Sequence, residues 1–527
     1  MPKLTIDGKE IEVPVGTTVI QAAEKLGIDI PRYCYHPALP VAGNCRICMV
    51  EIEKQPKLQI ACYTPVADGM VVKTTSPKVL EVRKTVLEFL LVNHPVDCPV
   101  CDQAGECKLQ DYYMEHGKYS SRLDDVKVKK EKKAVSLGPT VMLDQERCIL
   151  CTRCVRFADN ITKTSEFGIF NRGDHSQLDL YPGKKLDNNY SGNVVDICPV
   201  GALTDKDFRF KCRVWYLDHT KSVCPGCSMG CNINIDWDKS RPHQHKNGRV
   251  MRLKPRHNPE VNNYWMCDVG RYDYHPIDQN RIQWPQLNND LIAWPKAIET
   301  VAQAVKALTA TGRLDRIGVL ASAQLTNEDL FVVRKLFKDT WKGAHVDFTP
   351  LRVGKGDDLL LKEDRNPNTT GAVAILGPKA EAAHIIQKAK SGEIDLLYVF
   401  GHNLVEAYGK ETLQEIAKHV KLFVYQGSNI NETCGYANLI LPSTVYAEKD
   451  GTFTNCQLRV QRIWPAFAPL GDSKSDWEIL SLLSAELGVP VAYKNSQEIF
   501  KDIAATVGPF AGLSYEVIGD QGALLKT

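Results

Sequence analysis

Residues 94–107 read HPVDCPVCDQAGEC, and this stretch organises the interpretation of the whole chain. It places Cys98, Cys101 and Cys107 within ten residues of one another, with His94 just upstream. Thiolates and imidazoles bind zinc and iron–sulfur clusters, so four metal ligands can converge at this point. One further cysteine group precedes the stretch and two follow it. The sequence therefore predicts a protein with several metal or redox sites.

Length and composition are typical of a soluble multidomain protein. The 527 residues are enough for about three to five domains. The net charge of +2 gives no sign of nucleic acid as a partner. No run of about 18 apolar residues is present, so we expect no direct membrane insertion. Of the 18 cysteines, 16 lie from Cys34 to Cys267, and in a reducing compartment such clustering favours metal sites over disulfides.

The first cysteine group follows the element order of a β-grasp ferredoxin. Residues 3–13 alternate apolar and polar side chains around Asp7-Gly8, which predicts a hairpin. A helix capped by Thr17 or Thr18 is expected next. The group then supplies four thiols, at Cys34, Cys45, Cys48 and Cys62. Their spacing lengthens the first loop of the plant-type pattern but keeps four ligands, so we predict a [2Fe–2S] cluster. A four-cysteine zinc site is the alternative, although a zinc ribbon usually has two C-x2-C pairs.

The group at 94–107 supplies three thiolates, whereas a [4Fe–4S] cluster needs four ligands. A helix expected over residues 78–92 leads to His94. His94 is the nearest donor able to complete the set, and His116, nine residues past Cys107, is the competing donor. The predicted ligands are His94, Cys98, Cys101 and Cys107. A neutral imidazole in place of a thiolate makes the cluster less negative and easier to reduce, as in Rieske centres.

Two more groups each supply three close cysteines and one remote cysteine. The run CILCTRC followed by a distal Cys-Pro resembles the bacterial ferredoxin ligand pattern and favours iron over zinc; its ligands are Cys148, Cys151, Cys154 and Cys198. The run CPGCSMGC has a natural fourth ligand downstream; its ligands are Cys224, Cys227, Cys231 and Cys267. Between these last ligands CNINID and RVMRLKP alternate as strands do, so a small β-rich module is expected. Cys212, Cys434 and Cys456 remain unassigned.

After residue 273 the sequence predicts a parallel, doubly wound α/β domain. Apolar segments expected as strands are IGVLAS (317–322), AVAILG (372–377), DLLYVFG (395–401) and KLFVYQG (421–427). They alternate with helical patterns such as NEDLFVVRKLFKD (327–339) and EAAHIIQKAK (381–390). Neither G-x-G-x-x-G nor G-x-x-x-x-G-K-[ST] occurs there, so we expect no bound NAD or nucleoside triphosphate.

The order of these ligand sets resembles the G-subunit family of NADH-quinone oxidoreductase, respiratory complex I. The resemblance is carried by CYHPALPVAGNCRICMVE, HPVDCPVCDQAGECKLQD, RCILCTRCVRF, VVDICPVGALTDKDFRFKCRVW and CPGCSMGC. It implies one [2Fe–2S] cluster on the first set and [4Fe–4S] clusters on the second and third, in the electron path from flavin to quinone. The fourth set is similar to an extra [4Fe–4S] cluster that only some bacterial members keep, apart from the main path.

The C-terminal part resembles the molybdopterin oxidoreductase superfamily, most clearly in ANLILPSTVYAEKDGTFTNCQLRVQ (437–461). Only 254 residues follow the fourth module, and no cysteine lies between Cys267 and Cys434 to bind molybdenum. We therefore expect a reduced scaffold without molybdopterin.

The resulting expectation is a multidomain α+β and α/β protein. Its expected parts are a [2Fe–2S] ferredoxin-like domain (1–78), a [4Fe–4S] module with one His and three Cys ligands (79–120), a four-cysteine ferredoxin-like module (140–216), a four-cysteine module of molybdopterin oxidoreductase type (217–273) and the α/β domain (274–527). The resemblance implies a flavin/NADH-binding subunit and other peripheral-arm iron–sulfur subunits as partners, and a peripheral position on the cytoplasmic side of the inner (plasma) membrane. The alternatives are an electron-transfer subunit of a soluble NAD-linked hydrogenase or formate dehydrogenase, and a non-redox zinc scaffold.

Overall fold

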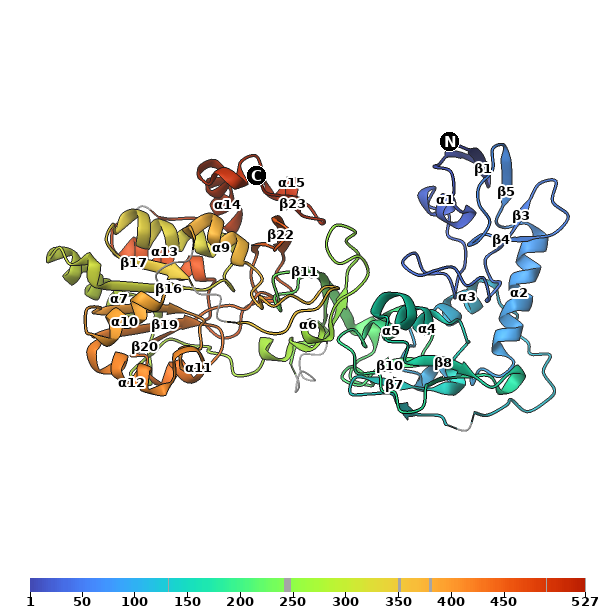
Figure 1. Cartoon of the computed structure of the whole chain (residues 1–527), viewed down its shortest axis with the longest axis horizontal. Coiled ribbons are helices and arrows are strands. Elements are labelled where there is room, and N and C mark those ends of the chain that lie inside the picture. The colour runs from blue at the N-terminus through green and yellow to red at the C-terminus, as the bar shows by residue number, and fades with distance from the viewer. Residues whose placement is uncertain (131, 241–247, 349–351, 379–381, 490, 527) are drawn as a thin grey trace. The chain divides into compact units, whose positions relative to one another are not determined.

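The computed structural model describes residues 1–130, 132–240, 248–348, 352–378, 382–489 and 491–526 (Figure 1). The chain divides into two compact units, Met1–Leu217 and Asp218–Thr527, and each is described by itself. No helix in the described ranges is both long and apolar enough to cross a membrane.

The first unit begins with a mixed five-stranded sheet in the order β2-β1-β5-β3-β4. Its strands are β1 (Lys3–Ile6), β2 (Lys9–Glu12), β3 (Met49–Ile52), β4 (Gln59–Ile60) and β5 (Met70–Lys73). The predicted hairpin is confirmed: β1 and β2 pair antiparallel, and Asp7 and Gly8 take positive φ angles of 46° and 81° in the turn. The predicted helix is also confirmed as α1 (Val19–Lys25), with Thr18 at the N-cap position, where its backbone N–H donates to Oε1 of Gln21 over 2.9 Å.

Short elements follow and carry the next two ligand groups. They are α2 (Pro77–Leu91), η1 (Cys98–Val100), α3 (Lys108–His116), η2 (Gln145–Arg147), α4 (Arg153–Phe157) and α5 (Asn193–Ile197). A three-stranded sheet, β10-β7-β6, and a hairpin, β8-β9, support them. The sheet strands are β6 (Val135–Ser136), β7 (Val141–Leu143) and β10 (Leu203–Asp205), and the hairpin strands are β8 (Phe167–Phe170) and β9 (Gln177–Leu180). Most ligands therefore lie in loops or at helix ends, held by small regular elements around them.

The second unit opens with the expected β-rich module. Its antiparallel sheet contains β11 (Leu217–Val223), β12 (Asn232–Asp238) and β13 (Val250–Pro255), followed by α6 (Asp268–Tyr272). Strand β12 contains all of CNINID except Cys231, and β13 contains all of RVMRLKP except Arg249, so both strand predictions are confirmed. A second small sheet consists of β21 (Gly451–Thr454), β22 (Arg459–Ile463) and β23 (Ala523–Leu524).

A seven-stranded sheet forms the centre of the second unit, in the order β15-β14-β20-β19-β18-β16-β17. Its strands are β14 (Gln286–Leu287), β15 (Asp290–Leu291), β16 (Ile317–Ala321), β17 (His345–Phe348), β18 (Leu396–Phe400), β19 (Leu422–Gly427) and β20 (Leu439–Pro442). Strands β17, β16, β18, β19 and β20 run parallel, and β14 joins antiparallel. The predicted parallel α/β arrangement is thus present.

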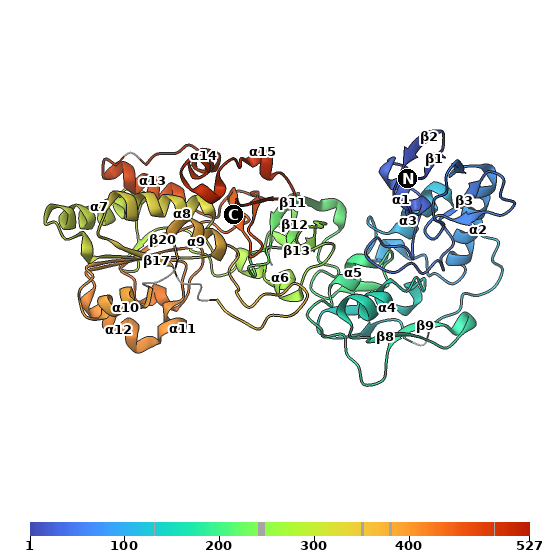
Figure 2. The ribbon, with the colours of Figure 1, turned by 45° about the horizontal axis from the view of Figure 1, so that its top comes forward.

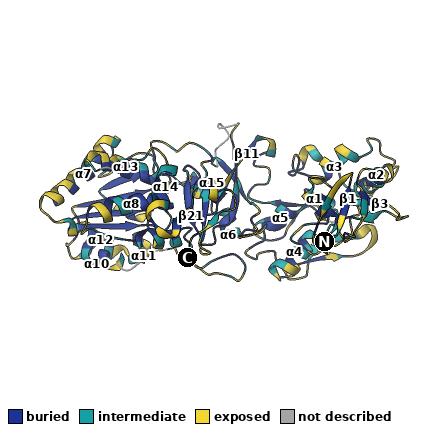
Figure 3. Cartoon of the chain, turned by 90° about the horizontal axis from the view of Figure 1, so that it is seen from above, coloured by how far each residue is buried: buried dark blue, intermediate teal, exposed yellow. Residues whose placement is uncertain are grey.

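Helices cover both faces of this sheet, as Figures 1 and 2 show. One face carries α7 (Trp294–Ala310), α8 (Asn327–Val333), α9 (Thr369–Leu376) and α13 (Asp476–Glu486), and their apolar side chains share one core. The other face carries α10 (Ala382–Lys390), α11 (Leu404–Tyr408) and α12 (Lys410–His419), with a second core. In Figure 3 the strands between these layers are buried and the outer helix surfaces are exposed.

One strand prediction is wrong, because AVAILG (372–377) belongs to helix α9. A short apolar run has no periodicity that separates a buried strand from a buried helix. Here the helix begins after Asn368 and packs against α8, burying Ala372, Ile375 and Leu376. The helical pattern at 327–339 continues from α8 into a π-helical turn, Arg334–Thr340. Glu381, the first residue of the expected helix at 381–390, lies outside the described residues.

Candidate metal centres

The four cysteines of the first group lie together beside α1 and β3. Cys34, Cys48 and Cys62 are buried, and Cys45 is partly buried. The backbone N–H of Cys34 donates to Sγ of Cys45 over 3.5 Å. Hydrogen bonds with Cys45 and Cys62 lower the pKa of the Cys34 thiol, and contacts with Cys34 and Cys48 raise the pKa of Cys62. All four sulfur atoms therefore belong to one connected group.

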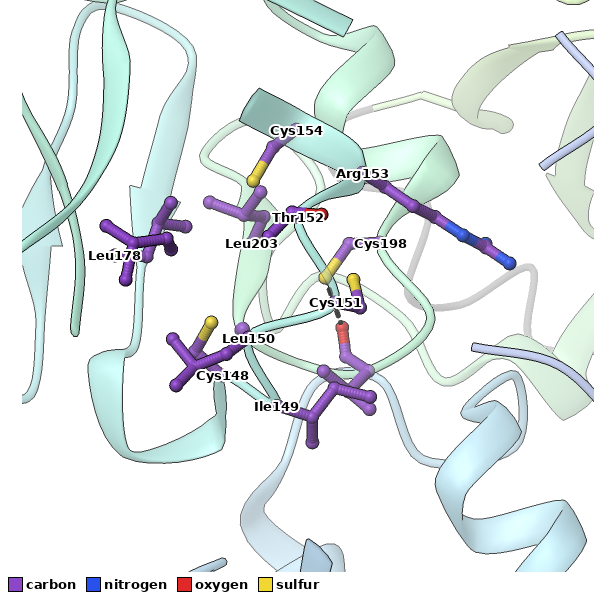
Figure 4. A pocket seen from close by; sticks show the side chains of 13 residues that line it. Cys148, Ile149, Leu150, Cys151, Thr152, Arg153, Cys154, Leu178, Cys198 and Leu203 are labelled. Carbon is purple, nitrogen blue, oxygen red and sulfur yellow. Dashed lines mark hydrogen bonds between the residues drawn. The ribbon is translucent and has the colours of Figure 1, made fainter. Parts of the chain in front are cut away.

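The third group lines a single cavity in the first unit (Figure 4). Sulfur atoms reach it from the loop before α4, from α4 itself and from the end of α5, at Cys148, Cys151, Cys154 and Cys198. Apolar side chains complete the wall, including Ile149, Leu178 and Leu203. Burial raises the pKa of Cys148 to about 12 and that of Cys151 to about 11. A dry cavity with four thiols suits a thiolate-bound cluster, because ligation removes the protons that burial otherwise retains.

Unusual backbone geometry accompanies these ligand loops. Leu150 and Thr152 have φ angles of 53° and 61°, Arg46 lies between two ligands with φ 60°, and Val96 precedes Cys98 with φ 44°. Positive φ is costly for residues other than glycine and persists where a site requires it. Such turns point successive N–H groups inward, which suits an anionic group.

The second group surrounds the start of α3. Cys98 begins η1, Cys101 ends it, and Cys107 precedes α3 as its N-cap. Burial raises the pKa of Cys101 and takes that of Cys107 to about 11. Arg213 holds this loop in place, donating to the carbonyl oxygens of Cys101 and Pro99 over 2.6 Å each.

The surroundings of the two histidines distinguish His94 from His116. Burial lowers the pKa of His94 to about 4, and its Nδ1 is buried with no hydrogen-bond partner among the described residues. The charges of Asp97 and Arg147 influence the pKa of both His94 and Cys101, so these two side chains share the same surroundings. His116 instead faces Glu115, Arg83 and Asp29 and stacks on Tyr112. A neutral imidazole with a free nitrogen beside this group is the form that binds metal, so the arrangement favours His94 over His116.

The fourth group lies in the second unit, where each of its cysteines is 5% exposed; they are Cys224, Cys227, Cys231 and Cys267. The N–H of Cys224 donates to the carbonyl of Cys231 over 2.9 Å, which closes the loop after β11. Sγ of Cys267 accepts from the N–H of Gly270 over 3.4 Å. Burial, followed by repulsion between the sulfurs, raises the pKa values of Cys224 and Cys231 well above normal.

Two glycines make room for ligand sulfurs. A Cβ on Gly201 would lie 2.5 Å from Sγ of Cys101, and a Cβ on Gly270 would lie 2.7 Å from Sγ of Cys224. The donor chemistry, the buried thiols and these close approaches all fit iron–sulfur clusters. Among the residues described, no three His, Cys, Asp or Glu side chains stand in an arrangement that could hold a single metal ion.

Sequence reasoning missed the arginines that join the ligand loops. Arg156 on α4 donates from Nη2 to the carbonyl oxygens of Cys34 (2.6 Å) and Cys151 (3.2 Å). Arg153 donates to the carbonyls of Ile197 (2.9 Å) and Tyr35. Both arginines stand inside CTRCVRF, so their position within a ligand run was the available signal. Arg147, directly before Cys148, forms a two-pronged ion pair with Asp97 (3.1 and 2.6 Å).

Comparison with protein-family models finds matches along most of the chain. The matching descriptions are a 2Fe-2S iron-sulfur cluster binding domain (2–77), the NADH-ubiquinone oxidoreductase-G iron-sulfur binding region (83–122), the ferredoxin-like domain of NADH-quinone oxidoreductase subunit 3 (138–204), the molybdopterin oxidoreductase Fe4S4 domain (217–277) and molybdopterin oxidoreductase (352–486).

Several relatives are similar over nearly the whole chain. The G subunit of NADH-quinone oxidoreductase from Rickettsia felis is 31% identical, covering 97% of this chain and 92% of its own length. The mitochondrial NADH-ubiquinone oxidoreductase 78 kDa subunit of Neurospora crassa is 32% identical, covering 98% and 84%. A chain of an NAD+-reducing [NiFe]-hydrogenase structure is 32% identical with a TM-score of 0.37, covering 40% of this chain and 91% of that one.

Ferredoxin-type, [4Fe–4S]-binding and molybdopterin-oxidoreductase-type domains on one chain define an iron–sulfur subunit of an oxidoreductase. With relatives of this identity and coverage, the chain belongs to the G-subunit family of NADH-quinone oxidoreductase, complex I. Electron transfer on iron–sulfur clusters is accordingly its activity within that oxidoreductase.

Proposed function

We propose that this chain holds one [2Fe–2S] cluster and three [4Fe–4S] clusters and passes electrons from a flavin subunit towards quinone. The [2Fe–2S] ligands are Cys34, Cys45, Cys48 and Cys62, and the [4Fe–4S] ligands are His94, Cys98, Cys101 and Cys107; Cys148, Cys151, Cys154 and Cys198; and Cys224, Cys227, Cys231 and Cys267. The observation that carries the proposal is the apolar cavity into which four cysteines of the third set project.

Contacts within the first unit support an order for the clusters that differs from their order in the sequence. The first and third ligand loops share Arg156, and Asn44 donates to the carbonyl of Leu150 over 3.2 Å. The third and second loops meet where the N–H of Lys108 donates to the carbonyl of Pro199 over 3.0 Å. The first loop also meets α3 of the second group, where the ring centroids of Tyr33 and Tyr112 lie 5.4 Å apart. The order proposed runs from the [2Fe–2S] cluster to the four-cysteine cluster and on to the His94 cluster.

The bound clusters supply one-electron transfer without bond making on the protein. The chain itself contributes ligation, low solvent access and the placement of polar groups around sulfur, which together set reduction potentials. The buried thiols and the apolar cavity wall serve the first two requirements. No acid, base or nucleophile is required for this role.

The α/β domain serves as a scaffold without molybdopterin in this proposal. The alignment with the Rickettsia felis relative runs over 628 positions, more than the 527 residues of this chain, so internal segments of that relative have no counterpart here. The order proposed for the clusters of the first unit does not include the fourth cluster, whose ligands belong to the second unit.

The proposed partners are a flavin/NADH-binding subunit and other iron–sulfur subunits of the peripheral arm, on the cytoplasmic side of the membrane. Electron transfer in a soluble hydrogenase or formate dehydrogenase is the competing assignment. Purification of the native assembly distinguishes them: quinone-reducing subunits should accompany this chain, and a hydrogenase or formate dehydrogenase subunit in their place would contradict the proposal.

Metal analysis combined with low-temperature EPR tests the cluster assignment. The proposal predicts about 14 iron atoms per chain, with negligible zinc and molybdenum, and signals from one [2Fe–2S] and three [4Fe–4S] clusters after reduction. Substantial zinc, or molybdenum near one per chain, would refute it. Substituting Cys154 by Ala should remove about four iron atoms, whereas the same change at the unassigned Cys434 should remove none.

A further inference from the structure

We propose that Arg153 and Arg156 form a cationic bridge between the first and third ligand loops and raise the reduction potentials of both clusters. This inference rests on the proposed function, because it assigns the two arginines a role towards the clusters of those loops. They are positioning residues that bind no iron: their hydrogen bonds hold the two loops, and their charges act on the clusters through space.

The hydrogen bonds show how the bridge spans the loops. Besides the carbonyls of Cys34 and Cys151, Arg156 donates from Nη1 to the carbonyl of Pro40 over 2.5 Å and from Nε to Oγ1 of Thr152 over 3.2 Å. Arg153 contacts Tyr35 of the first loop and Ile197, the residue before Cys198. Each guanidinium therefore joins the two loops by itself, from neighbouring positions on α4.

The charges around the two arginines are unbalanced. Every hydrogen-bond acceptor recorded for them is a neutral carbonyl or hydroxyl. Within the described ranges, no Asp or Glu forms an ion pair with either guanidinium, whereas Arg147 pairs with Asp97 and Asp144. Both arginines are partly buried.

A partly buried cation without a carboxylate partner is destabilising unless another anion compensates it. Each of the two clusters is held by four thiolates and therefore carries a net negative charge. Reduction makes that charge more negative. The clusters thus serve as counter-ions for the arginines, and the arginines stabilise the reduced state of both clusters. One bridge acting on both clusters raises their potentials together, so the difference between the two potentials changes little.

Redox titration of the whole protein, followed by EPR, tests this role. Arg156→Gln keeps a polar side chain and removes the charge; we expect reduction of both the [2Fe–2S] cluster and the four-cysteine cluster of the first unit to become about tenfold less favourable, a downward shift of about 59 mV for one electron. The His94 cluster should shift less. Arg156→Lys keeps the charge and should stay near the wild-type potentials.

The control is Arg122→Gln, which removes a charge from an exposed arginine paired with Glu88. It should leave all potentials unchanged. Unchanged potentials in Arg156→Gln, or equal shifts in the Gln and Lys variants, would overturn the inference. If Arg156→Gln loses iron, retention of both clusters by Arg156→Lys supports the bridge, and equal loss in both variants overturns it. Wild-type protein without these clusters would instead refute the proposed function.

Discussion

Gly201 lies so close to Cys101 that a Cβ atom on the glycine would stand 2.5 Å from the cysteine sulfur. Gly201 belongs to CPVGAL, three residues after a ligand of the third set, whereas Cys101 is a ligand of the second set. The backbone that carries one proposed cluster therefore forms part of the wall around its neighbour.

Gly201→Ala should displace Cys101 and lower the occupancy of the His94 cluster, because real Cβ atoms do not approach other atoms so closely. We expect a loss of up to about four of the 14 iron atoms, with loss of the corresponding EPR signal. Gly508→Ala is the matched control, since nothing lies within 4 Å of that Cβ position. Full iron content in Gly201→Ala would show that the loop of Cys101 can move aside and still hold the cluster.

His94→Cys should retain a cluster and lower its potential, because a thiolate adds negative charge where a neutral imidazole stood. EPR-monitored redox titration measures the change. His116→Cys serves as the comparison and should leave the potential unaltered, since His116 faces Arg83, Glu115 and Asp29. If the spectra and potentials of His94→Cys matched the wild type, His94 would not be a ligand.

Glu328 should make the second unit less stable as the pH rises. Burial raises the pKa of its carboxyl to about 8, compared with about 4.3 for an exposed Glu. The neutral form is favoured in the folded state, so its contribution is complete below about pH 4.3 and is lost as the pH rises through about 8, at up to about 1.4 kcal/mol per pH unit. Urea unfolding at several pH values measures this slope.

Glu328→Gln should flatten that dependence, because the amide keeps polar contacts with Thr452 and Tyr515 but does not titrate. Any pH dependence of stability that remains in the variant comes from other groups. Asp476 is one of them, because burial raises its pKa as well. An unchanged slope in the variant would assign the pH dependence elsewhere.

Lys449 should be essential to the stability of the second unit. Its Nζ is buried between Asp329 (2.9 Å) and Asp476 (2.7 Å). Burial lowers its pKa, but the two carboxylates outweigh this and raise it above normal. Lys449→Ala leaves both carboxylates without a counter-ion and should cost about 3–5 kcal/mol of unfolding free energy. Lys418→Ala removes an exposed pair with Glu415 and should cost less than about 1 kcal/mol.

Local patterns were sufficient to predict the hairpin at Asp7-Gly8, the helix capped by Thr18 and the central strands β16, β18 and β19. These features depend on neighbouring residues or on long buried runs. The helix at 372–377 was missed because six apolar residues carry no period, and its environment is supplied by α8. The spacing of the cysteines also placed four of them in one group, and the structure brings these four together around one cavity: Cys148, Cys151, Cys154 and Cys198.

Contacts between distant parts of the chain could not be read from the sequence. Arg156 reaches Cys34, and Gly201 reaches Cys101, because the fold brings their loops together. Spacing identifies which cysteines share a site, but it does not identify which sites are neighbours. The adjacency of the first loop to the third required the structure.

The fourth ligand loop depends on residues far downstream. Asn455 donates to the carbonyl of Met229 (3.1 Å), Gln461 donates to that of Gly230 (3.0 Å), and the N–H of Cys456 donates to Ser228 (2.8 Å). During synthesis from the N-terminus, these supports emerge long after the cysteines they brace, since Asn455 follows Met229 by 226 positions. The supports described for the ligand loops of the first unit lie within that unit, such as Arg213. The fourth ligand loop therefore cannot gain these supports until most of the chain has been made, whereas the first unit can fold earlier.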